Sequence, residues 1–190
     1  KGLAEEVILR HLNVFQANMD KPHGRFPLPW FLFDATQELF TRQGVDYIDL
    51  PETFIQQDDE EEWHPYISTD YKRGYLTPSV MQAAHWDTPS NYQVIGDRRL
   101  YVSPTPDDKY LIVFPHFARS EKFSTAEDNP WFTHFPMFVV LGTAYSIALA
   151  TANAVTRQNL EPLQKFEADN YIVTVEAWKH HMREYSLGPR

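Results

Sequence analysis

The residues of this chain that could carry out acid–base chemistry are its histidines and its acidic side chains. The sequence holds 8 His and 26 Asp and Glu residues. His116 and His134 are the candidates for a soluble hydrolase, because a histidine base works together with a carboxylate within hydrogen-bond reach. That chemistry requires their side chains to converge in one pocket with such a carboxylate.

Other kinds of chemistry find less support in the sequence. His180 and His181 are adjacent, so on a helix they point about 100° apart and do not share a metal ion easily. Neither a Gly-x-Ser-x-Gly nucleophile motif nor a Gly-rich phosphate loop occurs. The chain has 0 cysteines, which excludes disulfides, thiol catalysis and Cys-ligated zinc. We therefore expect no metal site, and the remaining features of the sequence are structural.

A run of acidic residues is the strongest charge feature. Five acids follow one another at Asp58, Asp59, Glu60, Glu61 and Glu62, in a chain with a formal net charge of -9. Such a run indicates either a solvated loop or a surface that faces a basic partner or a passage in which DNA must not be held. The acidic balance also disfavours nucleic-acid binding, which depends on Lys and Arg.

The central part of the chain carries the strand signals. Residues 92–114 read as three short strands, with turns at Gly96-Asp97 and at 104–108. The third strand is apolar on both faces, which places it in the middle of a sheet or under a helix. Residues 34–51 fit a helix ending at Gly44 or, as we favour, a hairpin turning at Gln43-Gly44. Residues 63–90 read as an irregular loop with a helical turn or two at 78–86.

The two ends of the chain carry the helix signals. Residues 3–16 have helical apolar spacing, and Asn129 with Pro130 predicts a capped helix start, restarted at Pro136. Residues 135–156 contain no charge, and we expect a buried helix there rather than a membrane span. A last helix is predicted over about 160–184, with these residues on one side: Leu163, Phe166, Val173, Ala177 and Trp178.

These elements predict an α+β fold, a mostly helical bundle with a small antiparallel β element and long loops. We expect a single domain over residues 1–190. Its helical part would comprise about 1–33 and 129–185, its β-rich part about 34–128, and a flexible tail 183–190. An uncharged helix in a chain of this size is hard to cover fully, which indicates packing against further copies.

The order of the motifs resembles that of head-to-tail adaptor (connector) proteins of tailed bacteriophages. The resemblance begins with "VDYIDLPETF" at 45–54 and continues through "TPSNYQVIGD" at 88–97 and "LYVSPTPDDKY" at 100–110. It ends with "NPWFTHFP" at 129–136 and "LGTA" at 141–144. It covers about two thirds of the chain, and the order of the motifs carries it more than any one of them.

The resemblance implies a structural virion protein without a cofactor. Such adaptors form a ring, usually of twelve copies, beneath the portal protein in the neck, and are assembled in the host cytoplasm. The ring extends the DNA channel, through which DNA passes without specific binding, and offers an attachment surface to a tail or nozzle protein. No membrane is involved.

Two stretches are the candidate contact surfaces for these partners. Near the carboxyl end, Tyr185, Leu187 and Arg190 are expected to face the portal. The acidic run at 58–62 is expected to line the channel or to face the tail.

Overall fold

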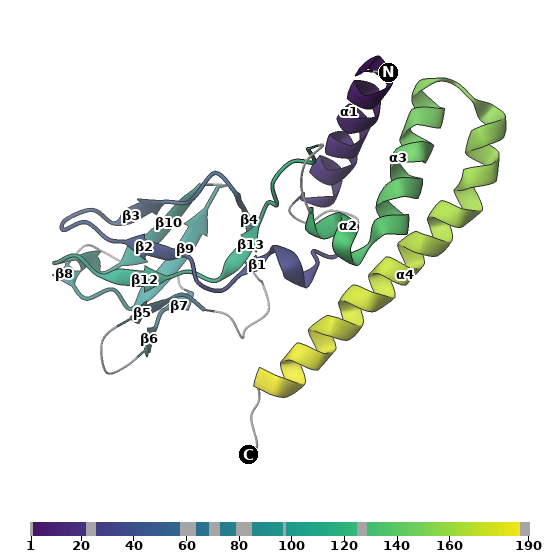
Figure 1. Cartoon of the computed structure of the whole chain (residues 1–190). Coiled ribbons are helices and arrows are strands. Elements are labelled where there is room, and N and C mark those ends of the chain that lie inside the picture. Colours follow the sequence, from purple (N-terminus) through teal and green to yellow (C-terminus); the bar gives the residue numbers. More distant parts are fainter. Residues whose placement is uncertain are drawn as a thin grey trace. The chain divides into compact units, whose positions relative to one another are not determined.

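The computed structural model describes residues 2–21, 26–57, 64–68, 73–78, 85–96, 98–124 and 129–186 (Figure 1). The chain divides into two compact units, which we name for their secondary structure. The helical unit comprises Lys1–Phe31 and Ser120–Arg190, and the strand unit comprises Leu32–Arg119. The strand unit is thus inserted, in sequence, into the helical unit. That the whole chain acts as a single domain stays a prediction.

The described part of the helical unit contains three long helices and one short one. They are α1 (Gly2–Met19), α2 (Pro130–His134), α3 (Pro136–Ala150) and α4 (Ala154–Ser186), and a 3-10 turn, η1 (Trp30–Leu32), lies at the border with the strand unit. The helices predicted over 3–16 and 160–184 are confirmed as α1 and α4, and both extend beyond the predicted ends.

Helix starts follow the capping signals in the sequence. The side chain of Asn129 accepts a hydrogen bond from the backbone N–H of Trp131 at 2.9 Å, and Pro130 occupies the first turn of α2. Pro136 begins α3, as predicted. The side-chain oxygen of Asn153 accepts from the N–H of Thr156 at 3.0 Å and caps α4.

The helical unit has its own aromatic core. Trp131, Phe138 and Tyr171 are almost completely buried, and Val139 and Val175 are fully buried beside them. Helices α1 and α3 approach closely at Gly142, where a Cβ atom would lie 2.3 Å from a ring carbon of Phe15. A residue without a side chain is therefore required at this crossing. No helix in the described part of the chain combines the length and the apolar character needed to cross a membrane.

The strand unit contains thirteen strands among its described residues, most of them two or three residues long. They are β1 (Phe33–Asp34), β2 (Glu38–Phe40), β3 (Tyr47–Asp49), β4 (Phe54–Gln56), β5 (Tyr66–Ser68), β6 (Arg73–Tyr75), β7 (Thr77–Pro78), β8 (Trp86–Asp87), β9 (Asn91–Ile95), β10 (Arg99–Ser103), β11 (Thr105–Pro106), β12 (Leu111–Val113) and β13 (His116–Ala118).

These strands form four sheets. The two four-stranded sheets have the orders β3-β10-β9-β7 and β2-β12-β5-β6, and the smaller ones have the orders β1-β13-β4 and β11-β8. One apolar core joins the two four-stranded sheets, in which Leu100, Ile112 and Phe114 are fully buried and Leu76 and Val102 almost so. Residues from both four-stranded sheets contribute to this core.

The predicted fold class is wrong. The chain is not a mostly helical α+β bundle with a small antiparallel β element and long loops, because the strands form a complete unit of their own. The region read as an irregular loop, 63–90, contains β5, β6, β7 and β8. Strands of two or three residues are too short for an alternating pattern to show in the sequence. Of these strands, β5, β7 and β8 pair with the later strands β12, β9 and β11. Of the helical turn predicted at 78–86, residues 79–84 lie outside the described part.

The turn predictions have a mixed outcome. Gly96 has φ 65° in the β9–β10 hairpin, and Gly44 has φ 74° in a tight turn closed by the Arg42–Val45 bridge, so both turns are confirmed. The strands flanking Gly44 do not pair with each other, since β2 pairs with β12 and β3 with β10. Likewise β12 does not extend the β9–β10 hairpin but lies between β2 and β5, in the middle of a sheet as its apolar sequence predicted.

Candidate assembly surface

The inward side of α4 is fixed by aromatic contacts. The ring of Tyr171 stacks on Phe138 with centroids 4.8 Å apart and meets Phe135 edge-on at 4.7 Å. Its hydroxyl donates a hydrogen bond of 2.5 Å to the carbonyl of Pro27. Burial raises the pKa of Tyr171, so the hydroxyl keeps its proton and remains a donor. These contacts determine which side of α4 faces solvent.

The outward side of α4 is also apolar, and it is open. Phe166 is 61% exposed, Val173 68% and Leu163 52%. At 100° per residue, Phe166 and Val173 lie on the opposite side of the helix from the buried Tyr171 and Val175. Burial of a side chain of this size is worth about 1.5–3 kcal/mol, so this side of α4 is a surface that gains by being covered.

The side predicted for α4 is found for four of its five residues. Leu163, Phe166, Val173 and Ala177 do share a side, but it is the exposed one. Trp178 is half-buried and contacts the ring of Trp30 at 5.9 Å. The helix therefore has two apolar sides. The second apolar side is visible in the sequence. A helix that packs on a single side requires one apolar stripe, and α4 has two.

Helix α1 likewise has exposed apolar residues opposite its buried ones. Val7 is 44% and Val14 48% exposed, whereas Gln16 and Met19 are buried. The side-chain amide of Gln16 donates hydrogen bonds to the hydroxyl of Ser120 at 2.7 Å and to the carbonyl of Glu121 at 2.9 Å. These bonds fix the rotation of α1, and with it the outward position of the two valines.

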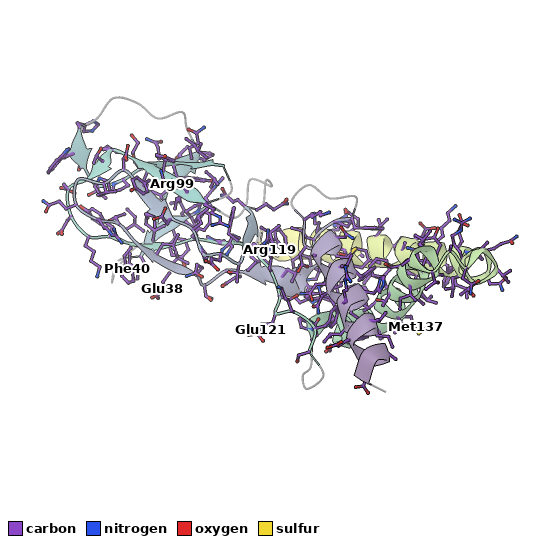
Figure 2. All side chains as sticks on the ribbon, turned by 90° about the horizontal axis from the view of Figure 1, so that it is seen from above. Glu38, Phe40, Arg99, Arg119, Glu121 and Met137 are labelled. Carbon is purple, nitrogen blue, oxygen red and sulfur yellow. The ribbon has the colours of Figure 1, made fainter. Side chains whose placement is uncertain are left out.

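Helix α3 is only partly buried. Its inward residues Phe138, Val139 and Gly142 are covered, but Met137 (labelled in Figure 2) and Val140 are 53% and 48% exposed. The uncharged helix predicted to be buried therefore also contributes to the surface. Each long helix of this unit thus exposes large apolar side chains.

Among the described residues, the strand unit exposes fewer large apolar side chains than the helical unit. Trp86 and Tyr75 are 63% and 58% exposed, and other exposed rings have polar neighbours. Phe40 (labelled in Figure 2) is 48% exposed, with the ammonium of Lys109 4.5 Å from its ring centre. The guanidinium of Arg99 lies 4.5 Å from the ring centre of Tyr47 and pairs with Asp49 at 3.4 Å. A cation above each of these rings gives that face of the ring a polar neighbour. This surface is therefore a weaker candidate for assembly than the helical unit.

The predicted contact residues lie mostly outside the described part of the chain. Leu187, Arg190 and the acidic run Asp58, Asp59, Glu60, Glu61 and Glu62 all lie outside it. Tyr185 belongs to α4, which continues to Ser186, so the predicted tail 183–190 is helical in its first four residues. The assignment of these residues to contact surfaces therefore stays a prediction.

The histidines proposed for hydrolysis sit in aromatic surroundings. His116 is completely buried, its ring stacks on Phe114 at 5.4 Å, and its Nδ1 lies 3.0 Å from the carbonyl oxygen of Phe114. Desolvation lowers the pKa of His116, so the ring is neutral. His134 stacks on Phe31 at 5.0 Å in the helical unit. Packing accounts for both side chains, and no group of three or more potential metal ligands occurs among the described residues.

Comparison with known families agrees with the resemblance seen in the sequence. The model of the SU10 adaptor protein family matches residues 3–183, nearly the whole chain. The chain therefore belongs to the SU10 adaptor protein family. Members of this family are phage adaptors, which are structural proteins that associate with portal and tail proteins and oligomerise in the virion neck. No curated protein matched the chain.

Proposed function

We propose that the protein is a head-to-tail adaptor that forms a ring of twelve copies beneath the portal. The ring extends the DNA channel of the portal and offers the surface to which a tail or nozzle protein attaches. The family membership of residues 3–183 supports the adaptor role. The exposed apolar side of α4, with Phe166 and Val173 more than half exposed, carries the proposal that copies pack against one another.

Net charge supports the proposed relation to DNA. A formal charge of -9 disfavours phosphate binding, which requires the displacement of counterions by Lys and Arg. A channel of this sign repels the genome, and DNA can slide through it instead of adhering to it. We propose that the acidic run at 58–62 faces this channel or the tail.

The carboxyl end is the proposed contact with the portal. Tyr185, Leu187 and Arg190 combine an aromatic, an aliphatic and a cationic side chain within six residues, a combination suited to a protein interface. Removal of residues after Glu184 should abolish docking to the portal while the far-ultraviolet circular dichroism spectrum stays that of a folded protein. Loss of the fold, or docking by the shortened chain, would contradict this assignment.

Co-purification with the portal protein of the same phage tests the proposed function. We expect a complex in which electron microscopy shows one ring of adaptor copies below the portal, continuous with its channel. A chain that remains unbound at high concentration, or that binds elsewhere on the capsid, would contradict the proposal. Replacement of the five acids at 58–62 by Asn and Gln should leave this complex intact and slow DNA ejection.

A further inference from the structure

The geometry points to a specific joint between copies: the open side of α1 on one copy packs against the open side of α4 on the next. This inference rests on the proposed function and names the surfaces that would hold the ring together. We define the α4 seam as Asn159, Leu163, Phe166, Asn170, Val173 and Ala177. We define the α1 seam as Ala4, Val7, His11, Val14 and Asn18.

The spacing of the α4 seam is that of a helix–helix contact. Its members follow one another at intervals of four, three, four, three and four residues, and all six are exposed. This alternation keeps side chains in line along a helix that packs lengthwise on another helix. The seam spans 18 residues, about 27 Å of helix. The surface is therefore shaped for a helix rather than for a loop or a sheet.

The α1 seam has the same alternation. Its members lie three, four, three and four residues apart, and Val7 and Val14 are its exposed apolar members. His11 is half-buried and lies 3.0 Å from the hydroxyl of Ser146, so it marks the side of the seam nearest α3. The seam spans 14 residues, about 21 Å. It fits within the length of the α4 seam.

Charge favours the pairing of these two seams. Neither contains Asp, Glu, Lys or Arg, although the chain carries a formal charge of -9 that opposes the approach of two copies elsewhere. The α4 seam contains two polar, uncharged asparagines, Asn159 and Asn170, and the α1 seam contains one, Asn18. A single asparagine at such a position can specify register at some cost in stability. The two seams thus meet without burying a charge.

The arrangement of the helical unit favours a head-to-tail joint over a pairing of like surfaces. Helix α3 packs against both α1 and α4, and Figure 1 shows α1 and α4 on different sides of it. One copy therefore presents two different seams, and a contact between unlike surfaces generates a ring when the rotation closes. Pairing of two α4 seams would instead give a closed dimer.

The helix directions predict which residues meet. Figure 1 shows that α1 and α4 begin at the same end of the helical unit and run the same way. The proposed joint places the ring axis along these helices, which keeps each residue at its height, so α1 meets the amino-terminal half of the α4 seam. Val7 should therefore approach Leu163 or Phe166 of the next copy and lie far from Val173, which is ten residues, about 15 Å, beyond Leu163.

Cysteine cross-linking tests this joint, because the chain has 0 cysteines of its own. A Val7→Cys chain is mixed with Leu163→Cys, Phe166→Cys or Val173→Cys chains at high concentration, with and without portal protein, and oxidised mildly. We expect Leu163→Cys or Phe166→Cys to give on the order of tenfold more cross-linked dimer than Val173→Cys, because a disulfide requires Cα atoms within about 7 Å. Ile95→Cys is the matched control, since Ile95 is 48% exposed and lies on the strand unit.

The outcomes separate this joint from the proposed function. Cross-linking no stronger than that of Ile95→Cys overturns the joint, and portal binding by the same chains would leave the adaptor function standing. A dominant Phe166→Cys homodimer overturns it in favour of paired α4 seams. Cross-linking at the expected pair in a chain that does not bind portal supports the joint and contradicts the proposed function.

Discussion

Leu100, Ile112 and Phe114 of the strand unit are fully buried, whereas Phe166 and Val173 of the helical unit are more than half exposed. Both units have an apolar core, so the difference does not reflect a failure to fold. It lies in what remains outside: the strand unit exposes scattered side chains, and the helical unit exposes apolar residues along each long helix. The strand unit thus buries most of its apolar side chains within itself. The helical unit leaves apolar surface that another protein surface can cover.

The largest expected effect on stability concerns the buried core of the strand unit. Leu100→Ala removes a fully buried side chain and should lower the free energy of unfolding by about 2–5 kcal/mol, from lost burial and the cavity left behind. Urea denaturation measures this loss. Ile95→Ala, in the neighbouring strand β9 and 48% exposed, should change stability by less than about 0.5 kcal/mol. Equal losses would remove the distinction between core and surface in this unit.

The next effect concerns the core of the helical unit. Gly142→Ala places a Cβ atom 2.3 Å from the ring of Phe15, and overpacking of this kind costs about 1–3 kcal/mol. The better helix propensity of alanine returns up to about 1 kcal/mol. Thermal unfolding should show a net loss, and a second change, Phe15→Leu, should recover part of it by making room. If Gly142→Ala stabilises the protein, the close crossing of α1 and α3 is wrong.

A smaller effect tests the start of α2. Asn129→Ala removes the cap on the N–H of Trp131 and should cost about 1 kcal/mol. Asn129→Ser keeps an oxygen acceptor suited to a helix start and loses the side-chain bond donated to the carbonyl of Glu121, so it should cost less. Chemical denaturation compares the two. A Ser variant as unstable as the Ala variant would show that the cap is not what Asn129 contributes.

Acidification should weaken the strand unit through His116. Burial lowers the folded-state pKa of His116 below the value of about 6.5 in the unfolded chain. The unfolded state then binds the proton more readily, so this contribution to stability is complete above pH 6.5 and is lost as the pH falls towards the folded pKa. Unfolding measured between pH 5 and 7.5 should show this slope, and His116→Asn should reduce it. An unchanged slope in the variant would contradict the assignment.

The sequence predicted local features better than long-range ones. The cap at Asn129, the helix restart at Pro136 and the turns at Gly44 and Gly96 each depend on a few neighbouring residues, and all are found in the structure. The strands β5 to β8 were missed because each has only two or three residues, and β5, β7 and β8 also pair with the later strands β12, β9 and β11. Pairing between distant segments has no local signature that a single sequence shows.

The surface of the helical unit could be predicted only in part. Periodicity correctly grouped Leu163, Phe166 and Val173 on one side of a helix. It did not tell whether that side faces the core, because an apolar side covered by a second copy has the same sequence pattern as one covered within the chain. The buried positions of Tyr171 and Val175 on the other side of α4 show which side faces the core.

The central claim is that the open side of α4 packs against another copy. The number of adaptor copies bound to the portal tests it most directly. Phe166→Asp places a charge in the middle of the open side of α4, and Ile95→Asp places the same charge on a residue of the strand unit that is 48% exposed. Native mass spectrometry of purified portal complexes should show a full complement of adaptor copies with Ile95→Asp and few or none with Phe166→Asp, while both variants keep the unfolding temperature of the parent chain. A full complement with Phe166→Asp would contradict the account.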